Sequence, residues 1–262
     1  MSSIKKLREK YLAGEKLVCL TGYDALMSSI LAEAGVDFIL VGDSLSNVIA
    51  GYANTLPVTM EQMLWHTQMT VRGAKGVPVV ADMPFLSYEV SVQEAVVNAG
   101  RFIKEGGADA VKLEGGTAVE PVIKALTAAH IPVCGHVGLQ PQSVLTLGGY
   151  AVQGKDVNEA ERIKRDALAV QEAGAFAVVL EMVPAKLAAE ITGMLKIPTI
   201  GIGAGPDCSG QVLVTHDLLG FSEKKLKIAK RYAEMRSTAL EALKNYVADV
   251  KDGRTPSKEN SF

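Results

Sequence analysis

The sequence predicts a closed (β/α)8 barrel, the TIM barrel, in which eight parallel strands alternate with helices. Eight apolar runs of strand length occur along the chain, and stretches with helical periodicity separate them. Several of these stretches end at glycine, as in Ala34-Gly35 and Ala173-Gly174, which is a common stop signal for helices. A length of 262 residues suits one barrel of this kind. Eight regular repeats therefore favour a closed parallel barrel over the alternative, an open doubly wound sheet.

The expected elements follow in order along one domain, residues 1–262. Each strand is a short run rich in Val, Ile, Leu or Ala, and each helix repeats apolar residues every three or four positions. Residues 1–10 predict an N-terminal amphipathic helix, residues 222–250 a C-terminal helical extension and residues 251–262 a polar tail. The expected strands are Leu17–Thr21, Phe38–Gly42, Val77–Asp82, Ala110–Glu114, Ile131–His136, Ala177–Glu181, Ile197–Gly201 and Val212–Thr215. The expected helices between them are Ala25–Ala34, Thr59–Gly73, Val92–Glu105, Val119–Ala129, Glu159–Ala173 and Ala185–Leu195.

Charge and composition exclude several functional classes. The chain carries 27 basic and 29 acidic side chains, a net charge of -2, so it lacks the basic surface that nucleic acids or anionic membranes attract. No apolar run approaches the ~18 residues of a membrane span, and no signal peptide is recognisable. The three scattered cysteines, Cys19, Cys134 and Cys208, are typical of reduced thiols. We therefore expect a cytoplasmic enzyme that acts on small molecules.

Two connections are longer than the others. Residues 45–58 follow the second predicted strand, and residues 138–157 follow the fifth. Both leave the carboxyl edge of the predicted barrel, where the active sites of TIM barrels lie. Long loops in a compact domain usually bind ligands or cover a site, and we expect these two loops to do so.

Ionisable side chains stand at the carboxyl ends of five predicted strands. Because side chains alternate along a strand, Lys112 and Glu114 share one face of the fourth strand and both point into the barrel. Burying such groups costs free energy unless they compensate one another or bind something. The residues at the five strand ends are Asp43, Asp82, Glu114, His136 and Glu181. Their convergence at one edge predicts a functional site.

Each of these residues also has a purely structural interpretation. Asp43 and Asp82 could cap the helices that follow them, which is a common role of aspartate. Lys112 and Glu114 could form a simple buried ion pair, and His136 could be a hydrogen-bonded core histidine. Five such coincidences at one edge are much less frequent than any single one. The five residues together therefore favour a catalytic or binding role over a structural one.

The chemistry that fits this set is metal-assisted proton abstraction. Asp43, Asp82 and Glu114 offer hard oxygen ligands, which suit Mg2+ and disfavour Zn2+. Such an ion could chelate a 2-oxo acid and stabilise the enolate formed when the adjacent carbon loses a proton. Lys112 would neutralise the same charge, and Glu181 is the natural general base.

Motifs along nearly the whole chain resemble those of the ketopantoate hydroxymethyltransferase family. The resemblance implies a (β/α)8 barrel enzyme that transfers a hydroxymethyl group from 5,10-methylenetetrahydrofolate to 3-methyl-2-oxobutanoate (α-ketoisovalerate). The product is 2-dehydropantoate (ketopantoate), a precursor in pantothenate and coenzyme A biosynthesis. The motifs that carry the resemblance include Gly42-Asp43-Ser44-Leu45, Ala81-Asp82-Met83-Pro84, Val111-Lys112-Leu113-Glu114-Gly115-Gly116, Gly135-His136-Val137-Gly138, Pro141-Gln142-Ser143 and Leu180-Glu181-Met182-Val183-Pro184.

The same resemblance implies a role for each matching residue. Asp43, Asp82 and Glu114 correspond to the Mg2+ ligands, and Glu181 corresponds to the proton acceptor. The family pattern names no folate contacts for this chain, and it implies a cytoplasmic homo-oligomer, often a decamer. The residues that correspond to contacts of the oxo acid are Asp43, Ser44, Asp82 and Lys112, with His136 close to it. Two positions depart from the family pattern, since Ser46 replaces the usual Gly and Ser209 replaces a frequent Asp.

Three alternative functions remain open at this point. A Mg2+-dependent lyase or mutase of the phosphoenolpyruvate/isocitrate-lyase type would use the same enolate chemistry without folate. An aldolase would use Lys112 as a Schiff-base nucleophile. A non-catalytic sensor would bind the oxo acid without turnover.

Overall fold

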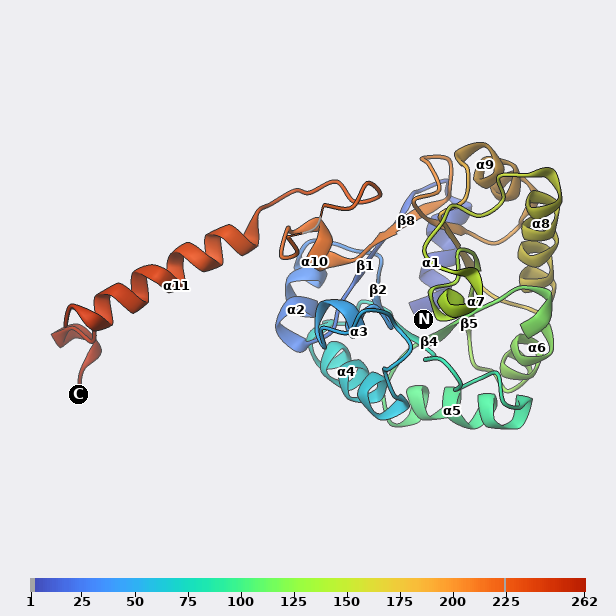
Figure 1. Ribbon diagram of the computed structural model, residues 1–262. Coiled ribbons are helices and arrows are strands. Elements are labelled where there is room, and N and C mark those ends of the chain that lie inside the picture. The colour runs from blue at the N-terminus through green and yellow to red at the C-terminus, as the bar shows by residue number, and fades with distance from the viewer. Residues whose placement is uncertain (1–2, 224) are drawn as a thin grey trace. The chain divides into compact units, whose positions relative to one another are not determined.

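The computed structural model describes residues 3–223 and 225–262 of the chain. Eight strands form a closed barrel in sequence order, β1 to β8. Each strand pairs in parallel with the next, and β8 pairs with β1 to close the barrel. The helices between the strands surround the barrel (Figure 1). The predicted (β/α)8 fold is therefore confirmed.

All eight strands lie within two residues of their predicted bounds. The eight strands are β1 (Leu17–Thr21), β2 (Phe38–Val41), β3 (Val79–Asp82), β4 (Ala110–Glu114), β5 (Val133–Gly138), β6 (Ala177–Glu181), β7 (Thr199–Ile202) and β8 (Gly210–Leu213). The prediction for β8, Val212–Thr215, was displaced by two residues at each end. Gly210 pairs with Leu17 in the sheet, and a Cβ atom there would lie 2.4 Å from the Leu17 carbonyl oxygen. The close approach of the two strands therefore requires glycine at position 210.

Four of the surrounding helices begin at side chains that cap their free amide groups. Asp24, Thr59, Ser91 and Asp156 each accept a hydrogen bond from a backbone N–H in the first helical turn. Because Asp156 is such a cap, α8 begins two residues before its predicted start at Glu159. The long helices are α1 (Ser3–Leu12), α2 (Ala25–Glu33), α4 (Met60–Gly73), α5 (Val92–Lys104), α6 (Glu120–Ala128), α8 (Val157–Glu172) and α9 (Ala185–Met194).

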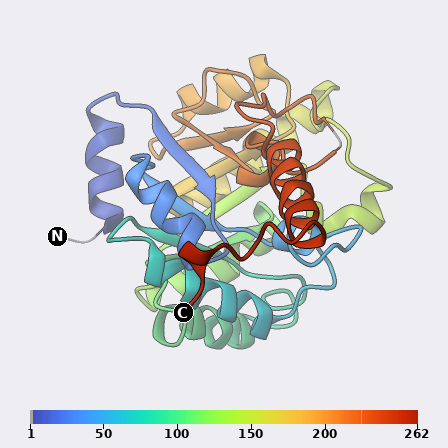
Figure 2. The same cartoon turned by 90° about the vertical axis from the view of Figure 1, so that its left-hand side faces the viewer.

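The two long loops follow β2 and β5 and carry short helices. The first contains α3 (Leu45–Val48), and the second contains the 3-10 turn η2 (Pro141–Ser143) and α7 (Val144–Leu147). Another 3-10 turn, η1 (Thr117–Val119), follows β4. Figures 1 and 2 together show α7 and α1 at opposite ends of the barrel. The β5 loop therefore lies at the carboxyl ends of the strands.

Apolar side chains fill two separate parts of the core. One part packs between the strands and the surrounding helices, and it includes Ile39, Met63 and Phe102. The other lies inside the barrel, where Leu7 of α1 packs with Cys19 and other strand residues. This inner cluster consists of buried side chains of α1 and the strands. All three cysteines are free and buried.

The chain divides into two compact units, Met1–Leu213 and Val214–Phe262. The first contains the whole barrel, and the second contains α10 (Thr215–Leu218), α11 (Met235–Lys251) and η3 (Lys258–Asn260). Within residues 3–223 and 225–262, no helix has both the length and the apolar character needed to cross a bilayer.

The prediction of a helix over residues 222–250 was wrong for its first part. Residues 222, 223 and 225–234 form no helix, and residue 224 lies outside the described residues. Lys227 is three residues from Lys230 and four from Arg231, so a helix would place like charges side by side. In the observed loop, the Arg231 guanidinium instead donates hydrogen bonds to the carbonyl oxygens of Ser222 and Glu223.

Candidate active site

The structure brings the predicted site residues together at the carboxyl end of the barrel. The parallel register places Asp82 beside Lys112 and Glu114 beside His136. These four side chains are buried, as is Asp43 just after β2, whereas Ser44 and Glu181 are partly exposed. Inward alternation on adjacent strands explains the convergence, as the sequence predicts.

Lys112 lies in the middle of the acidic cluster and forms its central ion pair. Its Nζ atom is 2.5 Å from Oδ1 of Asp82, and both side chains are almost fully buried. Burial alone would lower the pKa of Lys112, but the charges of Asp82, Glu114 and Asp43 raise the pKa above its ordinary value. Lys112 is therefore held as a cation, which is unsuited to a Schiff-base nucleophile.

Asp43 lies against Asp82, and the pKa of its carboxyl group is raised. Its backbone N–H donates a hydrogen bond of 3.2 Å to Oδ2 of Asp82. Burial raises the pKa of Asp43 to about 8, and the negative charges of Asp82 and Glu114 add to the effect. Burial likewise raises the pKa of Asp82, although Lys112 opposes the shift. The cluster thus holds more negative charge than Lys112 alone compensates.

His136 lies between two glutamates. Its Nδ1 atom is 3.4 Å from Oε1 of Glu114, and its Nε2 atom is 3.2 Å from Oε2 of Glu181. Burial and Lys112 lower the pKa of His136, but the two glutamates outweigh them and raise it to about 9. For Glu114 the balance is reversed, because burial favours the neutral acid while His136 and Lys112 bring the pKa below its usual value. The imidazole is therefore protonated at neutral pH.

Glu181 is the acidic residue of this site that solvent reaches. Its side chain is 16% exposed, compared with 2% for the carboxylate of Glu114. The next residue, Met182, has a φ of 48°, in the left-handed region that only a few per cent of non-glycine residues occupy. This sharp turn ends β6 directly after Glu181. Glu181 is thus oriented by a bend in the backbone on one side and by His136 on the other.

Ser44 contacts Tyr23, which was not among the predicted site residues. Its Oγ atom lies 2.8 Å from the hydroxyl group of Tyr23, which is buried just after β1. Ser46, the departure from the family pattern, lies within α3 without a positive φ, and its Oγ atom donates a hydrogen bond of 2.6 Å to the carbonyl oxygen of Asn54. Ser46 therefore holds the β2 loop without backbone strain.

Gln142 and Tyr88 are site residues that sequence reasoning missed. Gln142 donates from Nε2 to Oδ2 of Asp43 and from its backbone N–H to Oε2 of Glu114, each at 3.0 Å. The hydroxyl group of Tyr88 donates to Oε1 of Gln142 at 2.8 Å and accepts from the backbone N–H of Glu114 at 3.3 Å. The motif Pro141-Gln142-Ser143 was a signal for Gln142, whereas nothing in the sequence around Tyr88 indicated its contact.

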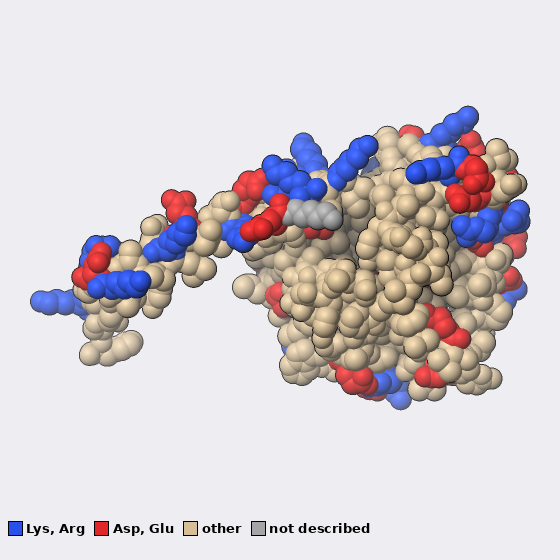
Figure 3. All heavy atoms as spheres, viewed as in Figure 1, with Lys and Arg blue, Asp and Glu red and all other residues tan. Residues whose placement is uncertain are grey.

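The β5 loop covers the charged cluster. Through Gln142 it closes over Asp43 and Glu114, and both carboxylates are buried as a result. Figure 3 shows the same side of the molecule as Figure 1, and its central surface is largely uncharged, with most Lys, Arg, Asp and Glu at the margins. The charges at the strand ends are thus held beneath an uncharged cover.

The donor set fits a hard divalent cation, although the carboxylates are engaged by other partners. Within the described residues, no three His, Cys, Asp or Glu side chains are arranged as a ready metal site. Lys112 pairs with Asp82, and Gln142 donates to Asp43 and Glu114. However, Oε1 of Glu114 is buried and makes no hydrogen bond, with the charged imidazole of His136 lying 3.4 Å away, and Asp43 lies among excess negative charge. Oxygen-only donors with one unsatisfied oxygen suit Mg2+ better than Zn2+.

The fold and the site together define a (β/α)8 barrel enzyme with an acidic site at the carboxyl ends of its strands. A family model described as ketopantoate hydroxymethyltransferase matches residues 1–258. The chain belongs to this family, so the resemblance recognised in the sequence is confirmed. It is 53% identical over 262 residues to the 3-methyl-2-oxobutanoate hydroxymethyltransferase of Geotalea daltonii, covering 100% of this chain and 98% of the relative. The corresponding enzyme of Moorella thermoacetica is 55% identical over 250 residues, covering 95% and 93% of the two chains.

Two solved structures of enzymes with other names have a similar fold. A phosphonopyruvate hydrolase, solved as a complex with oxalate and Mg2+, superposes with a TM-score of 0.66 at 15% identity, covering 99% of this chain and 93% of that one. A 2,3-dimethylmalate lyase of the PEP mutase/isocitrate lyase superfamily gives a TM-score of 0.63 at 15% identity, with coverage of 100% and 92%. At this identity the similarity establishes the fold alone.

Proposed function

We propose that the protein transfers a hydroxymethyl group from 5,10-methylenetetrahydrofolate to 3-methyl-2-oxobutanoate and releases 2-dehydropantoate. Family membership supports the reaction, and one observation in the site supports its chemistry most directly. Glu181 is a partly exposed carboxylate at the edge of a buried cluster of three carboxylates, Lys112 and His136. A base that can reach substrate, next to groups that stabilise negative charge, suits abstraction of a proton beside a carbonyl.

The chain's own residues would bind and orient the oxo acid. Ser44, positioned by Tyr23, offers a hydroxyl group toward the substrate carboxylate or keto oxygen. Lys112 provides a permanent positive charge in a region from which water is largely excluded, where electrostatic interactions are strong. Asp43, Asp82 and Glu114 would hold Mg2+, which when bound supplies Lewis acidity toward the keto group.

Glu181 would then accept the proton from C3 of the oxo acid. The electron pair of the broken C–H bond forms the C2–C3 double bond of the enolate, whose C3 attacks the methylene carbon carried by the folate. The methylene carbon is bonded to two folate nitrogens, and both of these bonds break: one as C3 attacks, and the other as a water molecule adds its oxygen to the carbon as the hydroxyl group. The proton taken from C3 and one proton of the water pass to the two nitrogens, so tetrahydrofolate is released. His136, charged and 3.2 Å from Glu181, holds the carboxylate of Glu181 in place.

The test is exchange of the C3 proton of 3-methyl-2-oxobutanoate with D2O, measured by NMR in the presence of Mg2+. The Glu181→Gln variant should lose at least about a hundredfold in exchange rate, since a positioned general base contributes ~10²–10⁴-fold. Binding of the oxo acid, measured by calorimetry, should survive. Glu172→Gln is the matched control, because Glu172 is an exposed residue of α8. Retained exchange in Glu181→Gln would remove Glu181 from this role.

Requirement for folate separates the proposed reaction from its rivals. A lyase or mutase would turn over the oxo acid without 5,10-methylenetetrahydrofolate, and a sensor would bind the oxo acid without exchanging its proton. We expect proton exchange without folate but product only with it. We also propose that the enzyme works in the cytoplasm as a homo-oligomer, as its family suggests, which size-exclusion chromatography with light scattering would test.

A further inference from the structure

A second pocket lies at the other end of the barrel from the candidate active site. It is lined by the first residues of several strands, including Leu17 of β1, Phe38 of β2 and Ala177 of β6, and by α1. Its volume is about 430 Å³, which lies within the usual range of small-molecule sites. The residues placed in the active site are all absent from its lining. The pocket is therefore a separate feature of the barrel.

The walls of this pocket are apolar and aromatic. Phe38 and Leu7 are buried, and Phe176 is partly buried, so these side chains already form fixed surfaces. Ile200 continues the apolar wall into the barrel interior. Such a surface favours a ligand with a planar or branched apolar body, because the ligand removes both surfaces from water.

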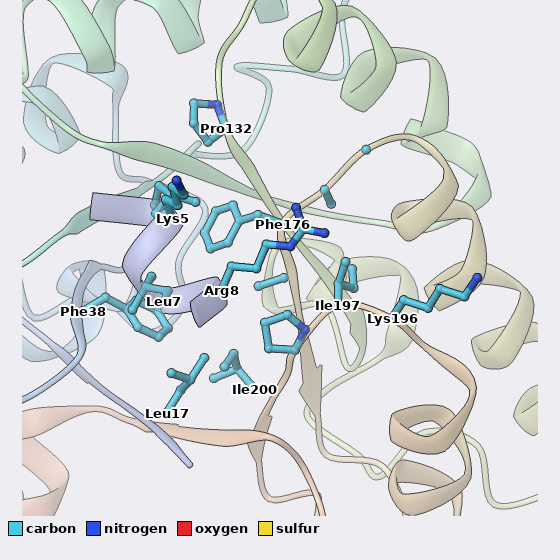
Figure 4. A pocket seen from close by; sticks show the side chains of 15 residues that line it. Lys5, Leu7, Arg8, Leu17, Phe38, Pro132, Phe176, Lys196, Ile197 and Ile200 are labelled. Carbon is cyan, nitrogen blue, oxygen red and sulfur yellow. The ribbon is translucent and has the colours of Figure 1, made fainter. Parts of the chain in front are cut away.

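The charge of the pocket is positive and uncompensated. Lys5, Arg8 and Lys196 line it, and none of its fifteen lining residues is acidic. Figure 4 shows Arg8 extending from α1 toward Phe176, with Lys5 on the same helix. Lys10, also on α1, forms an ion pair with Asp37, but within the described residues no ion pair involves Lys5, Arg8 or Lys196. In a protein with a net charge of -2, this is a local concentration of unpaired cations.

We propose that this pocket is a binding site for a small organic anion with an apolar body. Its carboxylate, sulfonate or phosphate group would contact Arg8 and Lys5, and its apolar part would lie between Phe38 and Phe176. Arg8 suits such a head group because the planar guanidinium can donate two parallel hydrogen bonds to it. Binding there would stabilise the folded protein by mass action.

A brominated aromatic acid, 4-bromobenzoate, is a suitable probe. It would be soaked into crystals of the full chain grown with Mg2+ and 3-methyl-2-oxobutanoate at saturating concentrations, so that the active site is occupied. An anomalous bromine peak between Phe38 and Phe176, with the carboxylate at Arg8, is the expected result. A pocket that stays free of bromine, or is filled by another copy of the chain, would overturn the proposal.

Two comparisons in solution test the requirement for charge. In calorimetry under the same conditions, Arg8→Gln should weaken 4-bromobenzoate binding about tenfold or more, as expected for loss of a charged hydrogen bond. The matched control is Lys6→Gln, since Lys6 is an exposed α1 residue outside the pocket lining. The neutral 4-bromobenzamide should bind the unaltered protein about tenfold more weakly than the acid. Equal binding of amide and acid would show an apolar cavity without an anion site and would refute the proposal.

Discussion

The side-chain amide of Gln142 donates a hydrogen bond of 3.0 Å to Oδ2 of Asp43, across 99 positions of sequence. The same amide nitrogen donates to the carbonyl oxygen of Met83, also at 3.0 Å, and its oxygen accepts from Tyr88. Gln142 therefore fixes one carboxylate oxygen of Asp43. In metal sites, groups of this kind orient the ligands and tune their affinity.

Replacing Gln142 by Ala should weaken the binding of a divalent ion. The change frees Asp43 and leaves the Tyr88 hydroxyl without its acceptor, so we expect the Kd for Mn2+ to rise about tenfold or more. Electron paramagnetic resonance of free Mn2+ measures this without turnover. Gln140→Ala is the control in the same loop, because the Gln140 side chain is hydrogen-bonded to Ser143 rather than to the acidic cluster. Unchanged Mn2+ affinity in Gln142→Ala would contradict the positioning role.

Replacing Lys112 by Met should strongly destabilise the metal-free protein. The substitution leaves Asp82 buried without its cation, which costs about 3–5 kcal/mol of the free energy of unfolding. Lys124 and Glu120 provide a matched comparison, since their ion pair has the same 2.5 Å distance but its side chains are 58% and 31% exposed. Lys124→Met should cost no more than about 1 kcal/mol. Urea unfolding of the two variants measures the difference, and equal losses would show that burial does not matter here.

Restoring charge balance should recover part of that loss. In the Lys112→Met/Asp82→Asn double variant, the negative charge of Asp82 is removed together with the positive charge of Lys112. We expect the double variant to be more stable than Lys112→Met alone, because the two residues are in direct contact. Additive losses in the same urea assay would argue against the ion pair as the cause.

The metal-free protein should lose stability as the pH rises from about 6.5 to about 9. His136 has a pKa of about 9 in the folded state, above its ordinary value of 6.5, so its contribution is complete below pH 6.5 and disappears as the pH rises through 9. The pKa of Asp43, which burial raises from 3.8 to about 8, also makes the folded protein less stable as the pH rises, but over a lower pH range. Between pH 8 and 9 the decline should therefore depend mainly on His136 with its partners Glu114 and Glu181. Urea unfolding of His136→Gln should show a smaller decline in that interval, and an equal decline would exclude His136 as its source.

Binding of Mg2+ should release a proton near neutral pH. With a pKa of about 8, Asp43 is largely protonated at pH 7 and has to lose its proton to become a ligand. Calorimetry at pH 7 in two buffers with different ionisation enthalpies should give different apparent binding enthalpies. Asp43→Asn should remove most of this buffer dependence. Identical enthalpies in both buffers for the unaltered protein would show that Asp43 is already ionised.

The sequence by itself determined the fold class, most of the elements and the charged strand ends. Strands such as Ala110–Glu114 and Ala177–Glu181 were predicted with their observed bounds. Their signals lie in spacings of two to four residues, which are local properties of the chain. The parallel order of the strands then brings their last residues to one edge, so Asp82, Glu114 and Glu181 could be placed together before any contact was known.

Only the tertiary structure decided the contacts between distant segments. The hydrogen bond from Tyr88 to Gln142 spans 54 positions, and no local spacing encodes it. The position of β8 likewise depended on the close approach of Gly210 to Leu17, which exists only once the barrel closes. Loops are held by single contacts rather than by a repeating pattern, so their partners follow from the folded chain and not from the order of residues.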